Sequence, residues 1–380
     1  MKNIIITIWI ICSFIFGYFI LQNQGIEISY KYMGFVLIGF LFAFVSTIIL
    51  FFKNKAIRQK LHLIFFPFLL GLIFLEFYDF VNESFYEYHM NLYNPPKSPY
   101  YTYPSDSNTR WNNDEFEHYR KTNSLGLCDI EPKIKKDTIT NTIIGLGDSF
   151  TEGWGAHSDS TWLKFLERKI STNSKIQYQF INAGVGGSDP AFEYILLRDK
   201  LLKFKPNTVV LTLGYELEEM VIRGGLERFQ ENGTLKYRKK PFWYRLYKIS
   251  GAFRLIARNS FTNHMLIPEY KVKNEEKMAI YKIQSILLLF KQMSLKFNFK
   301  FVLAIYPEHW EVVNKKYDYW TETIKFAQQN KITTVDLLKF YTDSVHMNDS
   351  NISNYYWIKD GHHNAKGYEK MAEGIFQSIH

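Results

Sequence analysis

Hydrophobic residues fill three long runs at the start of the chain. The runs Ile4–Leu21 and Met33–Phe52 carry no charged residue, and each is close to the ~20 residues that a bilayer-spanning helix needs. The third run, Leu61–Val81, is equally apolar at first, but Glu76 and Asp79 interrupt it near its end. The pattern predicts three transmembrane helices.

The flanking charges predict how this anchor is oriented. A cleaved signal peptide is the alternative for the first run, but no small-residue cleavage site follows Leu21. Short basic loops stay in the cytoplasm, and the loop before the third run is basic, with Lys53, Lys55, Arg58 and Lys60. We therefore predict a multi-pass membrane anchor over residues 1–82, with everything after it outside the cytoplasm. A third run that only lies on the surface would reverse this orientation.

The pattern changes twice after the anchor. Residues 83–140 are rich in Tyr, Asn, Pro and Ser and show no sustained period, which predicts a linker that drapes over the domain without catalytic groups. From residue 141 to 380, short apolar runs alternate with amphipathic stretches of helical length, which is typical of a parallel sheet with crossover helices.

The predicted elements follow from these runs. The expected strands are Thr142–Leu146, Tyr178–Ile181, Thr208–Leu213, Lys300–Ile305 and Thr333–Leu337. The expected helices are Thr161–Ser171, Ala191–Phe204, Asn274–Lys296, Lys315–Asn330 and Lys366–Ile379. This order predicts one α/β domain with a doubly wound parallel sheet, a size that one hydrophobic core can support.

Charge is concentrated in one insertion. Residues 223–273 hold twelve Lys or Arg and three Glu, a net charge of +9 that equals that of the whole chain. Apolar residues from Phe242 to Ile256 recur there at near-helical spacing between the basic ones. Three interpretations remain: a helix on an anionic bilayer, a lid over the active site, or a solvated helix packed by its apolar face. The predicted location outside the cytoplasm excludes nucleic acid as a partner. The two cysteines, Cys12 and Cys128, favour neither a disulfide nor a metal cluster.

A serine follows the first predicted strand of the domain. The strand ending at Leu146 runs into Gly147, Asp148 and Ser149, so the hydroxyl is expected at the carboxyl edge of a parallel sheet, where ligands of such sheets bind. Ser149 could instead serve as the N-cap of the next helix. The sequence leaves both interpretations open.

A base for this serine is available near the C-terminus. Asp360 precedes His362 by two residues, a spacing at which side chains fall together in extended or loop structure, so the carboxylate could orient the imidazole. His363 is the alternative base. A zinc site of these residues is a further alternative, but adjacent histidines seldom point at one ion and no second ligand pair has the required spacing, so we predict no metal.

A glycine-rich turn offers donors for an oxyanion. The segment Asn182–Gly187 follows the second predicted strand of the domain, and its glycines let backbone N–H groups approach a substrate closely. A simple βα turn would account for the same glycines.

Together these segments resemble the SGNH/GDSL hydrolase family. The segment Gly147–Phe150 (GDSF) is similar to the first block of the family, Asn182–Gly187 to its Asn-x-Gly-x-x-Gly turn, and Asp360–Gly367 to its Asp-x-His-x-Asn-x-x-Gly block. Over residues 142–380 the resemblance implies a flavodoxin-like fold without a cofactor. The segment Thr122–Cys128 (TNSLGLC) also resembles one that precedes GDSF in membrane-anchored relatives.

The resemblance also implies roles. Ser149 would be the nucleophile, with His362 rather than His363 as its base and Asp360 orienting that base. The amides of Ser149 and Gly187 would hold the oxyanion, and Asn182 is a further candidate donor.

The third block departs from the family. Where the family places Gly-x-Asn, with the asparagine donating to the oxyanion, this chain has Gly214, Tyr215 and Glu216. An ionised Glu216 would repel an oxyanion. Three alternatives remain: Glu216 is protonated, Asn182 takes over as donor, or the activity is weak.

The leading functional hypothesis is a membrane-anchored serine esterase that removes O-acyl groups, above all O-acetyl, from a glycan outside the cytoplasm. An O-acyltransferase with a sugar acceptor would use the same triad and would need a membrane partner that supplies acyl groups. A non-catalytic, glycan-binding scaffold of the envelope is the alternative from another class. The expected partners are the lipid bilayer and an acylated glycan.

Overall fold

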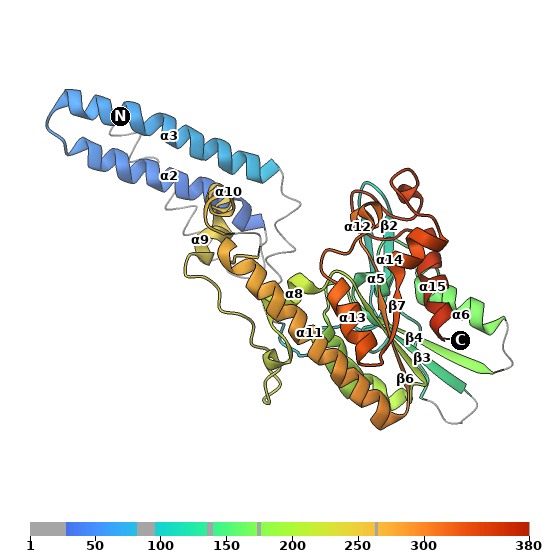
Figure 1. Cartoon of the computed structure of the whole chain (residues 1–380). Coiled ribbons are helices and arrows are strands. Elements are labelled where there is room, and N and C mark those ends of the chain that lie inside the picture. The colour runs from blue at the N-terminus through green and yellow to red at the C-terminus, as the bar shows by residue number, and fades with distance from the viewer. Residues whose placement is uncertain (1–27, 82–95, 135–139, 173–175, 263–264, 380) are drawn as a thin grey trace. The chain divides into compact units, whose positions relative to one another are not determined.

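The computed structural model describes residues 28–81, 96–134, 140–172, 176–262 and 265–379 (Figure 1). The chain forms two compact units. One unit comprises Met1–Asn94 and Arg238–Val272, and the other comprises Pro95–Tyr237 and Lys273–His380. We call the first the anchor unit and the second the sheet unit.

The anchor unit is built on a pair of long apolar helices. Helix α2 (Ile28–Leu50) and helix α3 (Lys55–Val81) run side by side (Figure 1). Within this unit the short helices α9 (Tyr244–Ile249) and α10 (Gly251–Ser260) pack on the pair. Both long helices are long and apolar enough to cross a membrane, through Met33–Leu50 and Lys55–Val81.

The predicted second and third membrane runs therefore lie in α2 and α3. Helix α3 begins at Lys55, six residues before the predicted run, because the basic residues of the loop form its first turns. The predicted first run, Ile4–Leu21, lies outside the described residues.

The sheet unit is a doubly wound α/β domain, which confirms the predicted fold class. Its five strands are all parallel and stand in the order β4-β3-β5-β6-β7, the flavodoxin-like order. The strands are β3 (Thr140–Gly147), β4 (Gln177–Gly184), β5 (Thr208–Leu213), β6 (Lys300–Ile305) and β7 (Thr333–Asp336). In chain order β3 comes first yet lies inside the sheet, so the direction of winding reverses beside it.

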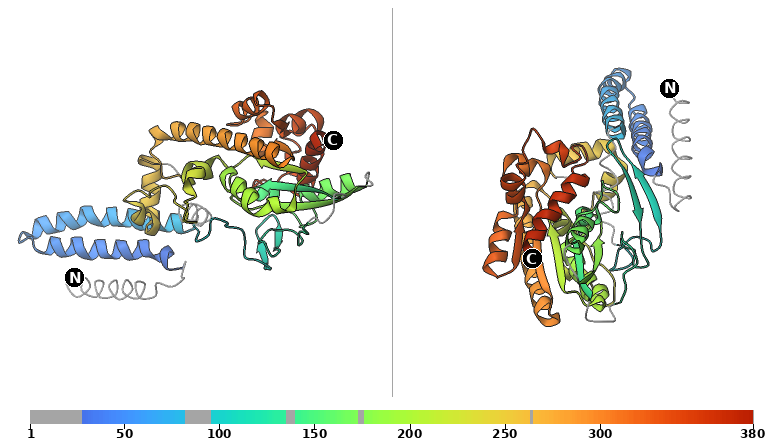
Figure 2. Two further views of the ribbon diagram at one scale, coloured as in Figure 1. Left: turned by 90° about the horizontal axis from the view of Figure 1, so that it is seen from below. Right: turned by 90° about the vertical axis from the view of Figure 1, so that its right-hand side faces the viewer.

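Helices cover both faces of this sheet (Figure 2). Helix α6 (Trp162–Ser171) and helix α15 (Ala365–Ile379) pack together on one face. On the other face, helix α7 (Pro190–Leu196) meets helix α11 (Glu269–Phe297), where the rings of Tyr194 and Phe290 stand edge to face at 5.4 Å. Phe290 also stacks on Phe301 of β6. Burial on both faces explains why the inner strands β5 and β6 are apolar over most of their length.

Shorter helices fill the connections. They are α5 (Ser149–Glu152), α8 (Leu217–Arg223), η4 (Leu226–Arg228), α12 (His309–Asn314), α13 (Thr321–Gln329), α14 (Leu337–Lys339), η5 (Phe340–Ser344) and η6 (Ile352–Asn354).

Three predicted elements are broken, change helix type or end early in the structure. The predicted helix Lys315–Asn330 is broken, because Lys315 adopts a left-handed φ of 52° that ends α12 and α13 begins only at Thr321. The predicted helix Ala191–Phe204 is α7 followed by a π-helix (η2, Leu197–Leu201) and a 3₁₀ turn (η3, Leu202–Phe204). The last strand stops at Asp336, whose side chain caps α14.

The predicted linker holds a hairpin that its sequence pattern did not reveal. Strands β1 (Asn108–Asn112) and β2 (Glu117–Lys121) pair antiparallel. Thr122 and Asn123 follow β2 directly. The chain forms a tight turn there, in which Asn123 Oδ1 accepts from the amides of Leu125 and Leu127. This turn is the TNSLGLC segment, and its first residue joins the two ends of the hairpin, since the amide of Thr122 donates to the carbonyl of Ser107 at 3.0 Å.

Candidate active site

Ser149 stands at the carboxyl end of the inner strand β3. It is the first residue of α5, and Asp148 is the N-cap that accepts from the amide of Phe150 at 2.9 Å. Gly147 has φ 152°, and a Cβ there would lie 2.1 Å from a side-chain oxygen, so the turn requires glycine. Capping is the task of Asp148, which contradicts the interpretation of Ser149 as a cap.

Three side chains join in one hydrogen-bonded relay. Ser149 Oγ lies 2.7 Å from His362 Nε2, and His362 Nδ1 lies 2.6 Å from Asp360 Oδ1. The relay is consistent when the hydroxyl donates to Nε2 and Nδ1–H donates to the carboxylate. His362 and Asp360 are about one fifth exposed and Ser149 is half-buried, so a substrate can reach the relay.

Asp360 is held from several sides. Trp154 Nε1 donates to its Oδ2 at 3.3 Å, and its own amide donates to Glu115, in the β1–β2 connection, at 2.8 Å. Burial alone would raise the pKa of Asp360, but the hydrogen bond and charge of His362 hold that pKa below its usual value. The carboxylate is therefore ionised and able to stabilise an imidazolium.

His363 points elsewhere. Its side chain is fully buried, its Nε2 lies 2.9 Å from Tyr341 Oη, and its ring meets that of Tyr356 edge to face. Burial, reinforced by the charge of His362, holds the pKa of His363 well below its usual range. The structure thus places His363 in the core as a neutral group, which contradicts its candidacy as the alternative base.

Asn182 fastens the second block to the first. Its Nδ2 donates to the carbonyl of Thr151 at 2.8 Å, and its Oδ1 accepts from the amide of Gly184 at 3.0 Å. Gly184 approaches α5 so closely that a Cβ would lie 2.1 Å from a backbone nitrogen. Because the side-chain amide of Asn182 already donates to the carbonyl of Thr151, Asn182 does not fit the role of an oxyanion donor.

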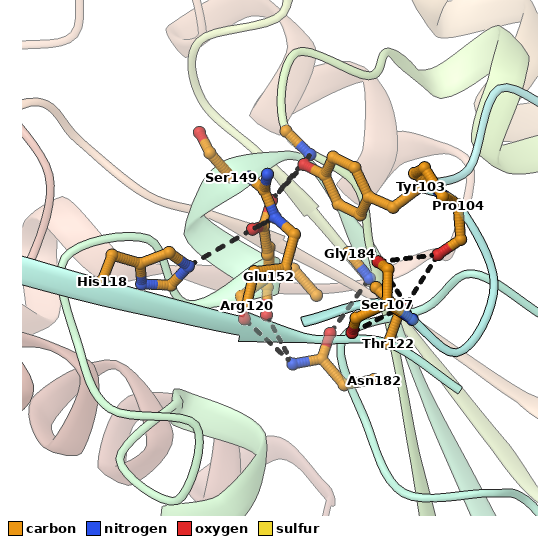
Figure 3. A network of polar contacts seen from close by, with 12 residues as sticks. Tyr103, Pro104, Ser107, His118, Arg120, Thr122, Ser149, Glu152, Asn182 and Gly184 are labelled. Carbon is orange, nitrogen blue, oxygen red and sulfur yellow. Dashed lines mark hydrogen bonds and ion pairs between the residues drawn. The ribbon is translucent and has the colours of Figure 1, made fainter. Parts of the chain in front are cut away.

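Glu152 forms a buried polar cluster that sequence reasoning missed (Figure 3). Arg120 Nε donates to its Oε1 at 2.8 Å, His118 Nε2 lies 3.5 Å from the same oxygen, and Tyr103 Oη donates to its Oε2. The amide of Gly186 donates to Glu152 Oε2 at 3.0 Å and meets Tyr103 Oη at 2.8 Å. Glu152 thereby holds the turn that contains Gly187, the expected oxyanion donor.

The charge of Glu152 is stabilised inside the protein. Burial would raise the pKa of Glu152, but the hydrogen bond of His118 and the charge of Arg120 hold it below its usual value. In turn Glu152 raises the pKa of Arg120 against the opposing effect of burial. A buried carboxylate of this kind persists only because it is paired and hydrogen-bonded.

The sequence held only part of the signal for this cluster. Glu152 lies in the segment GDSFTEG, three residues after Ser149, and could have been singled out by position. Tyr103, His118 and Arg120 lie in the segment that was predicted to lack catalytic groups, and no local pattern marks them. Their contribution depends on the hairpin lying over the end of β3.

The structure shows the surroundings of Glu216, the residue at which the third block departs from the family pattern. Glu216 is buried, its Oε2 accepts from the amide of Gly214 at 2.7 Å, and its Oε1 is buried without a hydrogen-bond partner among the described residues. Burial, and then the nearby charges of Asp148 and Glu193, raise the pKa of Glu216 well above its usual value. Of the three alternatives, the structure therefore favours a protonated Glu216, which brings no negative charge to the site.

Metal chemistry finds no support in the described part of the chain. There, no group of three or more His, Cys, Asp or Glu residues is placed to hold an ion. His362 faces Ser149 while His363 faces Tyr341, so the zinc alternative lacks converging ligands.

Several solved structures are similar to this chain. No family model and no curated protein matches the chain. Among solved structures, the chain is similar to an acetylxylan esterase from Geobacillus stearothermophilus, with 11% identity and a TM-score of 0.41 over 64% of this chain and 96% of the other. It is also similar to the psychrotrophic esterase EstA from Pseudoalteromonas sp., with 16% identity and a TM-score of 0.38 over 63% and 96%.

A third neighbour is described as a lipolytic protein of the G-D-S-L family from Desulfitobacterium hafniense. It shares 14% identity and a TM-score of 0.35 over 63% of this chain and 99% of the other. Because the identities and TM-scores are low, the function proposed below rests on the geometry of this chain.

Proposed function

We propose that the chain is a membrane-anchored serine esterase of the SGNH/GDSL type, which hydrolyses O-acyl groups, above all O-acetyl, on a glycan outside the cytoplasm. The observation that carries this proposal is the relay from Ser149 Oγ to His362 Nε2 at 2.7 Å and from His362 Nδ1 to Asp360 Oδ1 at 2.6 Å. A hydroxyl held against an oriented imidazole is the arrangement of an activated nucleophile.

The reaction follows from this arrangement. Ser149 Oγ attacks the ester carbonyl while its proton passes to His362 Nε2, and Asp360 stabilises the imidazolium that forms. The amides of Ser149 and Gly187 stabilise the oxyanion. The tetrahedral intermediate collapses, and the departing sugar hydroxyl takes the proton from His362. Water, activated by the same imidazole, then releases the acid and regenerates Ser149.

The glycan part of the proposal rests on an exposed aromatic side chain beside the relay. Trp111 of β1 is 51% exposed, and its ring lies edge to face with that of Trp154 at 6.1 Å. Trp154 in turn donates to Asp360. A large flat ring that is half exposed is suited to stack against the apolar face of a sugar. The location outside the cytoplasm rests on the predicted orientation of the anchor.

Labelling of the full-length protein with a fluorophosphonate tests the nucleophile. We expect labelling of the wild-type protein and complete loss in Ser149→Ala and His362→Ala. Ser158→Ala, at an exposed serine of the same unit, is the matched control and should label normally. Equal labelling of Ser149→Ala would sink the assignment, and a folded wild-type protein that never labels but binds glycan would favour the scaffold alternative.

Product analysis separates hydrolysis from transfer. With an O-acetylated glycan the esterase releases free acetate, and Trp111→Ala should raise KM for the glycan while leaving hydrolysis of p-nitrophenyl acetate nearly unchanged. With p-nitrophenyl acetate as donor and a deacetylated glycan as acceptor, an acyltransferase would instead give acetylated sugar detectable by mass spectrometry.

A further inference from the structure

The basic insertion does not form one element. The structure assigns residues from Arg238 to Val272 to the anchor unit, together with the two apolar helices, whereas the residues before Arg238 belong to the sheet unit. Of the anchor part, α9 and α10 are helical. A basic helix pair thus belongs to the same unit as the two apolar helices.

The pair is fastened to the C-terminal end of α3. Glu76 is buried and accepts from the amides of Gly251 at 2.8 Å and Ala252 at 2.9 Å, at the start of α10. Asp79 pairs with Arg254. The two acids that interrupt the third apolar run are thus turned toward α10. Because α3 ends at Val81, these bonds place α10 beside the end of an apolar helix.

The face that α9 and α10 leave exposed is apolar as well as basic. Tyr244, Tyr247 and Ala257 are buried within the unit, whereas Phe242 is 98% exposed and Leu246 39% exposed. Phe242 lies in the turn before α9, and Arg245 and Leu246 are exposed in the first turn of that helix. A helix that turns only a polar face to water would bury Leu246, so the third interpretation of the insertion does not account for the exposed Leu246 of α9 and the exposed Ile256 of α10.

The segment that contains α9 and α10 is rich in basic and aromatic residues. Between Arg238 and Arg258 the chain holds seven Lys or Arg and no Asp or Glu. Trp243 lies among the rings of Tyr247, Phe253 and Phe261. Basic residues attract anionic headgroups, and Trp and Tyr concentrate at the boundary between headgroups and acyl chains. The same composition is typical of helices that lie in the interface plane.

We infer that α9 and α10 form an interfacial element that lies on the bilayer surface at the Val81 end of α3, with Phe242 and Leu246 immersed and the neighbouring Lys and Arg on anionic lipid headgroups. The inference rests on the proposed membrane anchoring, and it does not depend on the esterase activity. Charge complementarity and the attachment to α3 both favour a lipid surface as the occupant of this face.

Spin labels on the full-length protein in nanodiscs test this inference. In a background with Cys12→Ser and Cys128→Ser, whose folding is checked by circular dichroism, labels are placed by Leu246→Cys, Leu70→Cys and Asp349→Cys. Leu70 is exposed on α3 and reports on spanning, and Asp349 is an exposed residue of the sheet unit. Accessibility to oxygen measures contact with lipid, and accessibility to a water-soluble nickel complex measures contact with water.

We expect the label at position 246 to be more accessible to oxygen than that at 349 and less than that at 70. A label at 246 that behaves like the one at 349, while that at 70 is in lipid, would overturn the inference and leave the anchor intact. A label at 70 in water would instead overturn the anchoring on which both proposals rest.

Charge reversal tests the preference for anionic lipid. Lys239→Glu with Arg245→Glu should reduce the immersion of the label at 246 in discs that contain phosphatidylglycerol, and more so than in discs of phosphatidylcholine alone. Lys316→Glu with Lys331→Glu, at exposed residues of the sheet unit, is the matched control and should change nothing. An equal effect in both kinds of disc would overturn the role of the headgroup charge.

Discussion

Two pairs of carboxyl groups at the carboxyl edge of the same sheet differ in their charge. Glu152 and Asp360 each face a cation or an imidazole, and these partners hold their pKa values below the usual range in spite of burial. Glu193 and Glu216 are as deeply buried as Glu152, but neither has an ion-pair partner among the described residues, and burial raises the pKa of each well above its usual value. Burial alone thus does not set the charge of a carboxyl group, because the partners decide whether its penalty is offset.

The first way to sharpen this comparison is to remove the charge of Asp360. Asp360→Asn keeps the shape of the side chain but can no longer stabilise the imidazolium or fix the tautomer of His362. We expect kcat for p-nitrophenyl acetate to fall by ~10⁴-fold, the cost seen when a triad aspartate becomes an amide. Asp349→Asn, at an exposed residue, is the control. A loss below about tenfold would contradict the role of Asp360.

The second way is to remove the charge of Glu152, which leaves its partner Arg120 without a countercharge. Glu152→Gln strands the buried Arg120, and breaking a buried pair from one side costs about 3–5 kcal/mol of unfolding free energy. Denaturant unfolding followed by tryptophan fluorescence measures this cost. Glu167→Gln, which breaks a partly exposed pair with Lys164, should cost less than about 1 kcal/mol.

A double variant separates the pair from the shape of the site. Glu152→Gln combined with Arg120→Met removes both charges, so we expect part of the lost stability to return. Stability that falls further in the double variant would show that Arg120 stabilises the fold without Glu152.

The smallest effect is expected at Glu216, because a neutral carboxyl resembles an amide. A raised pKa means that the folded state binds more protons, so the stability that protonated Glu216 contributes is complete at low pH and is lost as pH rises toward its raised pKa. Glu216→Gln should therefore match the wild-type protein in acid and exceed it increasingly at higher pH, while kcat stays within about tenfold. Glu322→Gln, at an exposed helix position, should show no such trend. Stability lost equally at every pH would mean that Glu216 is not held neutral.

Local sequence patterns were sufficient for the fold. The apolar runs that became β5 and β6 match the structure residue for residue, because a strand buried on both faces must be apolar throughout. The GDSF block also placed Ser149 correctly at the end of β3, because glycine is required where the strand turns into α5. Helix breaks such as that at Lys315 were missed, because a non-glycine residue with positive φ has no strong local signal.

The sequence by itself thus determined the parallel sheet, the apolar helices and the candidate relay, since these depend on period, on turn chemistry and on motif order. Only the tertiary structure decided that His363 is buried against Tyr341, that Glu152 is held by residues of a distant hairpin, and that Glu76 fastens α10 to α3. It also decided that burial raises the pKa of Glu216. Each of these outcomes depends on contacts between residues far apart in the chain, and the charge of a buried group is set by the neighbours that folding brings to it.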